Sequence, residues 1–304
     1  MVLTWKAQDI VILSFSIPSV VLHTVGLIIL FGVQKGHGNQ ISAMISLAVS
    51  ELIFSFVASA YSLCKISGIQ NEILFNYFAG IDAFSTVANK LGVIYLVIER
   101  LLEVYFHMKY PLMFSHKTAC FILTGIWVIS GLNGLALGIF RGYGNAKNLL
   151  YTIYNFVFVA LDLVFLCAVV MTYSYFLIKV RNIRRIDVSY KMQVRKQKHS
   201  IKILSIRRSK FIIPLLIAVT YILFNVSSTV LYQVWRYGQD PNSLQPSDVF
   251  FAARLNSMIG YICDSVFHIF MHKEVRTCIL SACTIKRSNS IRSQDAKRKH
   301  ATNG

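Results

Sequence analysis

The sequence has few acidic residues, few prolines and no cysteine framework. Only 13 of its 304 residues are Asp or Glu, against 31 Lys or Arg, and only 5 are proline. Half of the 6 cysteines fall inside long apolar stretches, which leaves no set for extracellular disulfides. The sequence also lacks a Gly-rich phosphate loop, a His/Cys spacing typical of metal sites and a Ser-His-Asp order. We therefore expect that the protein is not an enzyme.

Long apolar runs are what the sequence does contain. Each of seven runs reaches the roughly 20 residues that a helix needs to cross about 30 Å of hydrocarbon. A backbone in lipid must satisfy its own hydrogen bonds, so such runs are expected to be helices. The sequence thus predicts an all-α membrane protein, a bundle of seven transmembrane helices. The predicted spans are Ile10–Val33, Ile41–Cys64, Ile73–Tyr105, Ala119–Phe140, Leu149–Ile178, Phe211–Trp235 and Val249–Met271.

The segments outside the spans are short. The first apolar run is far longer than the core of roughly 7 to 15 residues in a secretory signal, so we expect it to remain as a span. Apolar residues at helical spacing after the last span predict a short helix on the membrane surface. The predicted organisation is an extracellular segment at 1–9, the seven-span domain at 10–271, the membrane-parallel helix at 272–284 and a disordered basic cytoplasmic tail at 285–304.

Two cysteines, Cys278 and Cys283, lie in the predicted membrane-parallel helix. Palmitate on either thiol would anchor this helix in the inner leaflet. A bare thiol facing the membrane is the alternative, and the sequence leaves both open.

Basic residues are unequally divided between the two sides of the predicted bundle. Lys and Arg in the loops, rather than net charge, set the orientation of a membrane protein. Segments 179–210 and 273–299 hold most of them. The opposite side has only Lys6, Lys65, Arg141, Lys147 and Arg236. We expect the amino terminus outside and the carboxyl tail in the cytoplasm. The net charge of +18 then follows from this topology and from attraction to anionic lipid of the inner leaflet, rather than from binding to nucleic acid.

The third predicted span carries polar residues along one face. Asp82 and Arg100 are separated by five helical turns, so they share a face at opposite ends, about 27 Å apart. Asn89 lies between them on nearly the same face. Ionisable residues inside a membrane are costly and indicate a functional site by default. This span is predicted to direct an acid at the outer mouth of the bundle and a cation at its inner end.

Motifs at the matching depths resemble those of the rhodopsin-like (class A) G-protein-coupled receptors. Glu99-Arg100-Leu101 stands where that family has Asp-Arg-Tyr at the cytoplasmic end of span three. Further matches are Leu47-Ala48-Val49-Ser50-Glu51-Leu52 in span two, Trp127 in span four, and Asp264-Ser265-Val266-Phe267-His268 followed by Lys273-Glu274-Val275-Arg276 in and after span seven. Each match is weak alone. Together they resemble a divergent, orphan-type member of the family.

The resemblance implies a plasma-membrane receptor that binds an extracellular ligand between its outer helix ends and activates a heterotrimeric G protein. By family analogy Glu99 holds Arg100 at rest and releases it when span six swings outward. An ordinary interfacial ion pair is the alternative. Asp264 and His268 would belong to the same activation machinery. The short outer segments favour a small ligand over a large protein ligand.

Several positions depart from the family pattern. Glu51 stands for Asp, and Ser265 and His268 stand for Pro and Tyr. Other departures are Thr24 in place of Asn in span one, Asn225 and Ser227 in place of Trp and Pro in span six, and Phe75 in place of the first cysteine of the outer disulfide. Two alternatives therefore stay open: a receptor-like protein that no longer signals and partners other receptors, and a membrane transporter. A transporter should show internal repeats, which the sequence lacks.

The resemblance also implies a ligand pocket at the outer helix ends. Its candidate residues are Asp82, Ser85, Thr86, Asp162 and Arg254. Asp82 resembles the acid that binds the ammonium of amine ligands in a branch of the family. Arg254 can reach the same face, and an Asp82–Arg254 pair would neutralise both charges without a ligand; we favour this pair. Ser85 and Thr86 either contact a ligand or hydrogen-bond within their own helix.

A second polar group is expected deeper in the bundle. Glu51, Asn89 and Asp264 match the positions that line a sodium pocket in family members. Two carboxylates in a dry bundle cannot both stay charged without a cation or a shared proton. A bound sodium ion is one solution, and an ion pair with Lys90 or a protonated acid is the other.

Overall fold

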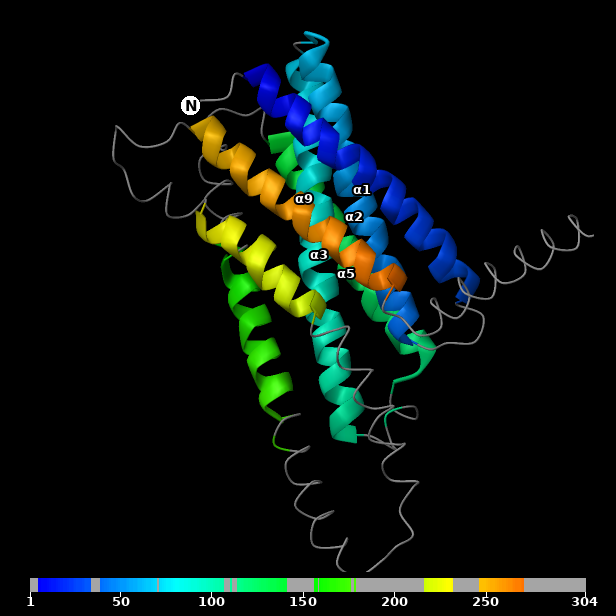
Figure 1. Cartoon of the computed structure of the whole chain (residues 1–304). Helices are drawn as coiled ribbons and strands as arrows, with labels where there is room; N and C mark the ends of the chain where they lie inside the picture. The colour runs from blue at the N-terminus through cyan, green and yellow to red at the C-terminus, as the bar shows by residue number, and fades with distance from the viewer. Residues whose placement is uncertain are drawn as a thin grey trace, which may run out of the picture.

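The computed structural model describes most of the chain as helix. The described residues are 5–33, 39–69, 71–106, 110, 114–140, 156–157, 159–175, 178, 216–231 and 246–270. Every regular element in these ranges is helical. The helices are α1 (Trp5–Val33), α2 (Asn39–Ile66), α3 (Glu72–Phe106), α5 (His116–Phe140), the Val159–Tyr175 helix, the Leu216–Leu231 helix with its π-helical turn η3 (Tyr221–Val226), and α9 (Pro246–Phe270) (Figure 1).

Four of the helices are long and apolar enough to cross a membrane. They are the apolar parts of α1, α2, α3 and α5, at Lys6–Gly32, Ile41–Ile66, Glu72–Glu103 and His116–Ile139. The Val159–Tyr175 and Leu216–Leu231 helices are apolar but shorter within the described residues. Within the described residues the structure thus confirms an all-helical architecture with four helices of membrane-spanning length and apolarity, and the full count of seven spans stays a prediction. The predicted membrane-parallel helix at 272–284 and the tail at 285–304 lie outside the described residues.

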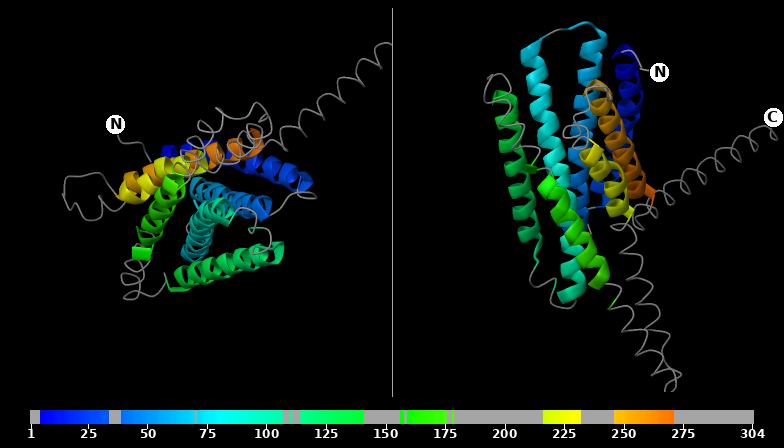
Figure 2. Two further views of the ribbon diagram at one scale, coloured as in Figure 1. Left: turned by 90° about the horizontal axis from the view of Figure 1, so that it is seen from below. Right: turned by 90° about the vertical axis from the view of Figure 1, so that its left-hand side faces the viewer.

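The helices pack side by side around α3. Helix α2 contacts both α1 and α3, α5 packs on α3, and α9 packs on α1 and on η3. Figure 2 shows α3 among the other helices when the bundle is seen from below, and Figure 1 shows it running from one end of the bundle to the other. Side chains on several faces of α3 therefore meet different neighbouring helices.

The outside of the described bundle is apolar, unlike the surface of a water-soluble protein, and several ionisable side chains are buried inside it. Large apolar side chains cover the outside; Phe121 is 80% exposed and Phe156 is 74% exposed. Buried side chains include Glu51, Lys90 and Asp264, which are at most 3% exposed. Ionisable groups turned inward and apolar groups turned outward are what hydrocarbon surroundings require.

Small residues allow two pairs of helices to approach closely. Between α1 and α2, hydroxyls meet directly: Ser59 Oγ donates to Ser16 Oγ at 2.7 Å. Between α3 and α5, a Cβ atom added to Gly80 would lie 2.8 Å from the carbonyl oxygen of Gly134. A Cβ atom on Gly134 would lie 2.6 Å from that of Phe84. The backbones themselves are therefore in contact, as small residues permit in membrane helices.

The turn η3 changes how the Leu216–Leu231 helix meets α9. A π-helical turn disturbs the regular hydrogen-bond ladder of a helix. Here Asn256 of α9 donates through Nδ2 to the carbonyl oxygen of Phe224 at 2.8 Å. Gly260 provides room beside it, because an added Cβ would lie 2.8 Å from that of Phe224. Thr220, the residue before η3, lies along the same interface and contacts Asp264 of α9, which belongs to the site described next.

Candidate functional site

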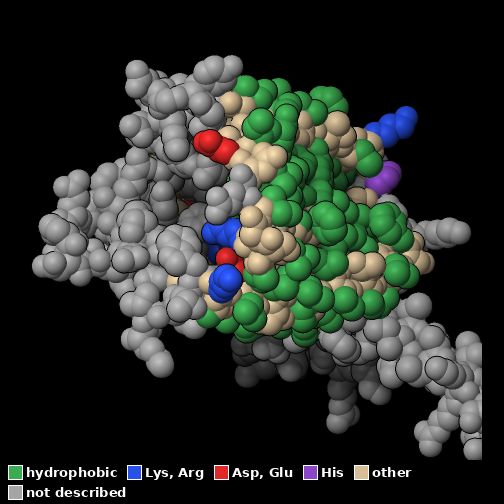
Figure 3. All heavy atoms as spheres, turned by 90° about the horizontal axis from the view of Figure 1, so that it is seen from above, with side chains coloured by type: hydrophobic (Ala, Val, Ile, Leu, Met, Phe, Trp, Pro, Cys, Tyr) green, Lys and Arg blue, Asp and Glu red, His purple; other side chains and the backbone are tan. Residues whose placement is uncertain are grey.

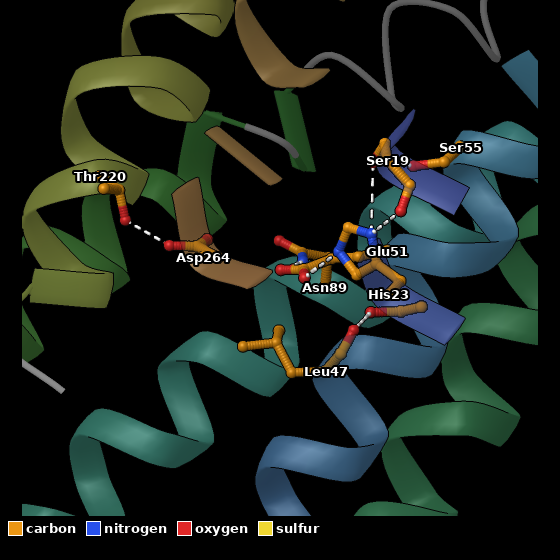
Figure 4. Close-up of polar contacts among 9 residues, drawn as sticks. Ser19, His23, Leu47, Glu51, Ser55, Asn89, Thr220 and Asp264 are labelled. Atoms are coloured by element: carbon orange, nitrogen blue, oxygen red, sulfur yellow. Dashed lines mark hydrogen bonds and ion pairs between the residues drawn. The ribbon is translucent and has the colours of Figure 1, made fainter. Parts of the chain in front are cut away.

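A fully buried polar group of the described bundle is centred on Glu51 of α2, which is 0% exposed. Nε2 of His23, from α1, lies 2.8 Å from Oε2 of Glu51. Nδ2 of Asn89, from α3, donates to Oε1 of Glu51 at 3.0 Å. Figure 4 shows these side chains turned toward one another. Three helices therefore meet at one carboxyl group whose two oxygens both have partners.

The second ring nitrogen of His23 limits where the protons of this group lie. Nδ1 is 2.7 Å from the backbone carbonyl oxygen of Ser19, which can only accept a hydrogen bond, so Nδ1 carries a proton. The remaining proton lies between Nε2 of His23 and Oε2 of Glu51, on one atom or the other. In either case the pair is neutral as a whole. His23 thus weakens the repulsion expected between the carboxyl groups of Glu51 and Asp264.

Asp264 lies in the same region but has its own donor. Thr220 Oγ1, from the Leu216–Leu231 helix, donates to Oδ1 of Asp264. Figure 4 shows Asp264 turned toward Thr220 and Glu51 turned toward His23. Oδ2 of Asp264 and Oδ1 of Asn89 are buried and have no hydrogen-bond partner within the described residues. Asp264 therefore joins α9 to the helix that contains η3.

The geometry corrects one expectation about this group, the role of Lys90, and shows that a second residue, Thr24, lies apart from it. Lys90 does not neutralise it, because Nζ of Lys90 contacts Asp162 instead. Thr24 does not face it either, because Thr24 is exposed and donates to the carbonyl oxygen of Val20 at 2.7 Å, while His23 takes the inward position. Both oxygens of Glu51 are occupied, so within the described residues only Asn89 and Asp264 of the predicted sodium set have an oxygen without a partner, and the sodium site stays a prediction. Within the described part of the chain, no cluster of three His, Cys, Asp or Glu side chains could hold a metal ion.

Lys90 and Asp162 form a separate buried ion pair between α3 and the Val159–Tyr175 helix. Oδ1 of Asp162 accepts from Nζ of Lys90 and from the hydroxyl of Tyr221 at 3.1 Å. Nζ of Lys90 also lies 3.4 Å from Thr229 Oγ1. Both charged side chains are less than one-tenth exposed. Asp162 is therefore held inside the bundle by three helices, and the structure places it with Lys90 rather than with Asp82.

At the end of the bundle that is predicted to face outside, called the outer end below, the structure contains the Asp82–Arg254 pair that the sequence favours. Nη2 of Arg254 lies 3.3 Å from Oδ1 of Asp82. The guanidinium also stacks on two rings of α2, 5.1 Å from the centre of Tyr61 and 5.9 Å from that of Phe54. The Arg254 side chain is 7% exposed and that of Asp82 is 26% exposed.

Four other polar residues lie at or near this outer site: two bond within their own helix and two add charge to the site. Ser85 Oγ and Thr86 Oγ1 donate to the carbonyl oxygen of Asp82, at 2.9 Å and 2.8 Å, so both hydroxyls bond within their own helix. Asp9 of α1 is buried, and Lys65 and Arg254 lie close enough for their charges to act on it. The outer site thus balances two acids against two bases.

At the inner end, Glu99 is buried and accepts a hydrogen bond from Tyr110 Oη at 2.8 Å. Arg100 follows it on α3, but its side chain, like that of His268 on α9, lies outside the described residues. Cys278 and Cys283 lie outside them as well. Roles for these residues in coupling or lipidation therefore stay predictions.

Sequence reasoning did not find His23 and Tyr110. His23 had a usable signal, because it and Glu51 are the polar groups at matching depth in the first two spans. Tyr110 follows the end of α3, and its contact with Glu99 depends on the path of the chain there, which no periodic pattern predicts.

Comparison with known proteins gives one distant match to a receptor. No protein-family model matches the chain. Over 139 residues it is 22% identical to the octopamine receptor beta-3R of Drosophila melanogaster, and the match covers 42% of this chain and 11% of that receptor. The chain thus spans about a ninth of the length of this relative. Together with the apolar, all-helical structure, the partial similarity fits a G-protein-coupled receptor and assigns no subfamily.

Proposed function

We propose that the chain is a rhodopsin-like, seven-span receptor that binds a small extracellular ligand at its outer helix ends and activates a heterotrimeric G protein. It would lie in the plasma membrane with its amino terminus outside. The observation that carries the proposal is the series of inward-facing charged residues along α3. Asp82, Lys90 and Glu99 stand at successive depths of this helix and contact α9, the Val159–Tyr175 helix and Tyr110, respectively.

This arrangement supports a receptor because α3 touches a polar group from a different partner at each depth. A change in the outer pair can alter the position of α3 or α9, and α9 also carries Asp264 and its contact with Thr220. Ligand binding at one end can then bias contacts at the other, which is what signalling across a membrane requires. Arg100, next to the buried Glu99, is the residue that would face the G protein.

The proposal is tested by nucleotide exchange on purified heterotrimeric G proteins, with the full chain in lipid nanodiscs and no added ligand. We expect exchange above that of the G protein alone. The predicted cytoplasmic start of span six has Arg207 and Arg208 and no acid that could form an ion pair with Arg100 and hold the two helices together at rest. Arg100→Ala should reduce this exchange at least tenfold. Lys117→Ala is the matched control, since it removes an exposed cation at the inner end of α5 and should leave exchange unchanged.

Exchange equal to that of the G protein alone across all G-protein classes would contradict the proposal. It would instead favour the receptor-like partner that does not signal, which the departures at Ser265 and His268 keep open. Equal loss in the Arg100 and Lys117 variants would also contradict it, because the effect would then follow surface charge.

A further inference from the structure

The outer ion pair leaves part of the Arg254 guanidinium unused. Arg254 is 8% exposed, and its single hydrogen bond to Asp82 comes from Nη2. Nε of Arg254 is buried and has no hydrogen-bond partner in the described structure. A guanidinium offers five N–H donors, and its Nε and Nη groups along one edge match the two oxygens of a carboxylate. A buried donor without a partner costs free energy, so this edge is suited to an anionic group.

The charge balance of the site restricts what such a ligand can be. An ammonium alone would bind Asp82 only by competing with Arg254, and the two cations would lie side by side. Arg254 cannot easily move away, because it is packed against the Tyr61 and Phe54 rings. A carboxylate alone would satisfy Arg254 but add a negative charge beside Asp82. A ligand that carries both charges gives each residue an opposite partner and leaves the site neutral.

The surroundings add an apolar wall. The Tyr61 ring, which stacks on Arg254, also packs edge-on against Phe75 at 5.2 Å between ring centres and lies 6.3 Å from Phe78. Figure 3, which looks at the bundle from above the view of Figure 1, shows Lys or Arg side chains directly beside an Asp or Glu side chain. The site thus joins a compact pair of opposite charges to an aromatic surface, which suits an apolar side chain on the ligand.

We propose that the outer site binds a small zwitterion, a free α-amino acid with an apolar side chain. Its carboxylate binds the Nε edge of Arg254, its ammonium binds Asp82, and its side chain packs toward Tyr61. This inference rests on the proposed receptor function for its location and goes beyond it in the class of ligand. It also separates this chain from a receptor for simple amines, since an amine lacks the group that Arg254 would bind.

The test compares each common amino acid with its decarboxylated amine and its deaminated acid, all with the same side chain. The full chain in nanodiscs is assayed by thermal unfolding at increasing ligand concentration. We expect at least one apolar amino acid to raise the unfolding temperature at concentrations about tenfold or more below those of its amine and acid partners, because each partner lacks one charged contact.

Two variants give the decisive readout. Arg254→Gln removes the competing cation beside Asp82, so the preference should change from the amino acid to the amine. Asp82→Asn should change it to the acid. Lys6→Gln is the matched control for an exposed outer cation and should keep the original preference.

An amine that binds the unaltered chain as well as its amino acid would overturn the inference, and so would an unchanged preference in both variants. If one variant does not fold, the other carries the same test. This outcome is separate from the proposed function: ligand-free nucleotide exchange can persist when the ligand class is wrong, and selective binding without exchange would sink only the signalling proposal.

Discussion

The outer ion pair and the central Glu51 group both place a carboxyl group inside the helix bundle, but they differ in how fully its hydrogen bonds are satisfied. Asp82 and Arg254 are joined by one contact of 3.3 Å, and Asp82 is 26% exposed. Glu51 and His23 are at most 1% exposed, and both oxygens of Glu51 have a hydrogen-bond partner. The outer pair therefore has unused hydrogen-bond capacity, while the central pair has none. A ligand site needs the first arrangement, and a structural junction of three helices needs the second.

Replacement of His23 should cause the largest loss of stability among the charged and polar groups compared here. His23→Ala leaves the buried Glu51 with Asn89 as its only remaining donor in the described structure, and we expect a loss of about 3 to 5 kcal/mol in the free energy of unfolding. Thermal and denaturant unfolding in nanodiscs would measure it. Thr24→Ala, one residue along α1 and exposed, is the control and should change stability little. Equal losses in the two variants would show that His23 does not support Glu51.

Replacement of Lys90 should cause the second largest loss of stability. Lys90→Met leaves Asp162 buried but still bonded to the Tyr221 hydroxyl, so we expect a smaller loss, about 2 to 3 kcal/mol. The double variant Lys90→Met with Asp162→Leu should recover part of this loss, because no unpaired charge then remains. Unfolding of the two variants side by side would measure the difference. No recovery in the double variant would mean that the pair is not the cause.

The outer pair should contribute least of the three groups to the free energy of unfolding. Asp82→Asn removes one charge from a partly exposed contact of 3.3 Å, and Arg254 keeps its aromatic neighbours. We expect a loss of about 1 kcal/mol, after allowance for solvent around Asp82. The same unfolding assay applies. A loss as large as that of His23→Ala would end the distinction between a ligand site and a junction.

Sodium should have no specific effect on the unaltered chain. His23 and Asn89 already occupy both oxygens of Glu51, so among the described residues an ion would find only Oδ2 of Asp264 and Oδ1 of Asn89 without a partner there, and two oxygens are too few to hold it. Replacing sodium by choline at constant ionic strength should leave the unfolding temperature unchanged, since a ligand that does not bind cannot stabilise. A rise in unfolding temperature that depends on sodium concentration would contradict this and restore the predicted sodium site.

Much of the fold was predictable because lipid imposes one rule on every span. The apolar runs predicted α1, α2, α3 and α5 to within a few residues at each end. The Asp82–Arg254 contact was also predictable, because it needed only two charges at the same depth on facing helices. Both results depend on position along a helix.

What the sequence did not predict depends on position around a helix. Successive residues are separated by about 100°, so Asn89 and Lys90 face different neighbours, and the same holds for His23 and Thr24. Assigning Lys90 to the Glu51 group ignored this rotation. Which neighbour lies on each side of α3 follows from packing, and a single sequence does not contain that information. Tyr110 was missed because it lies beyond the regular part of α3.

The glycine contact between α3 and α5 determines where the bundle can rearrange. With the backbones of Gly80 and Gly134 already touching, neither helix can roll or slide past the other without a steric clash. The interface between α9 and η3 is of another kind, because Asn256 has three nearby acceptors, Phe224 O, Ser227 Oγ and Ser228 Oγ, and can exchange one for another at little cost. The contact between α3 and α5 thus leaves no space for the two helices to move closer, whereas the contact between α9 and η3 can keep a hydrogen bond to Asn256 through a small shift.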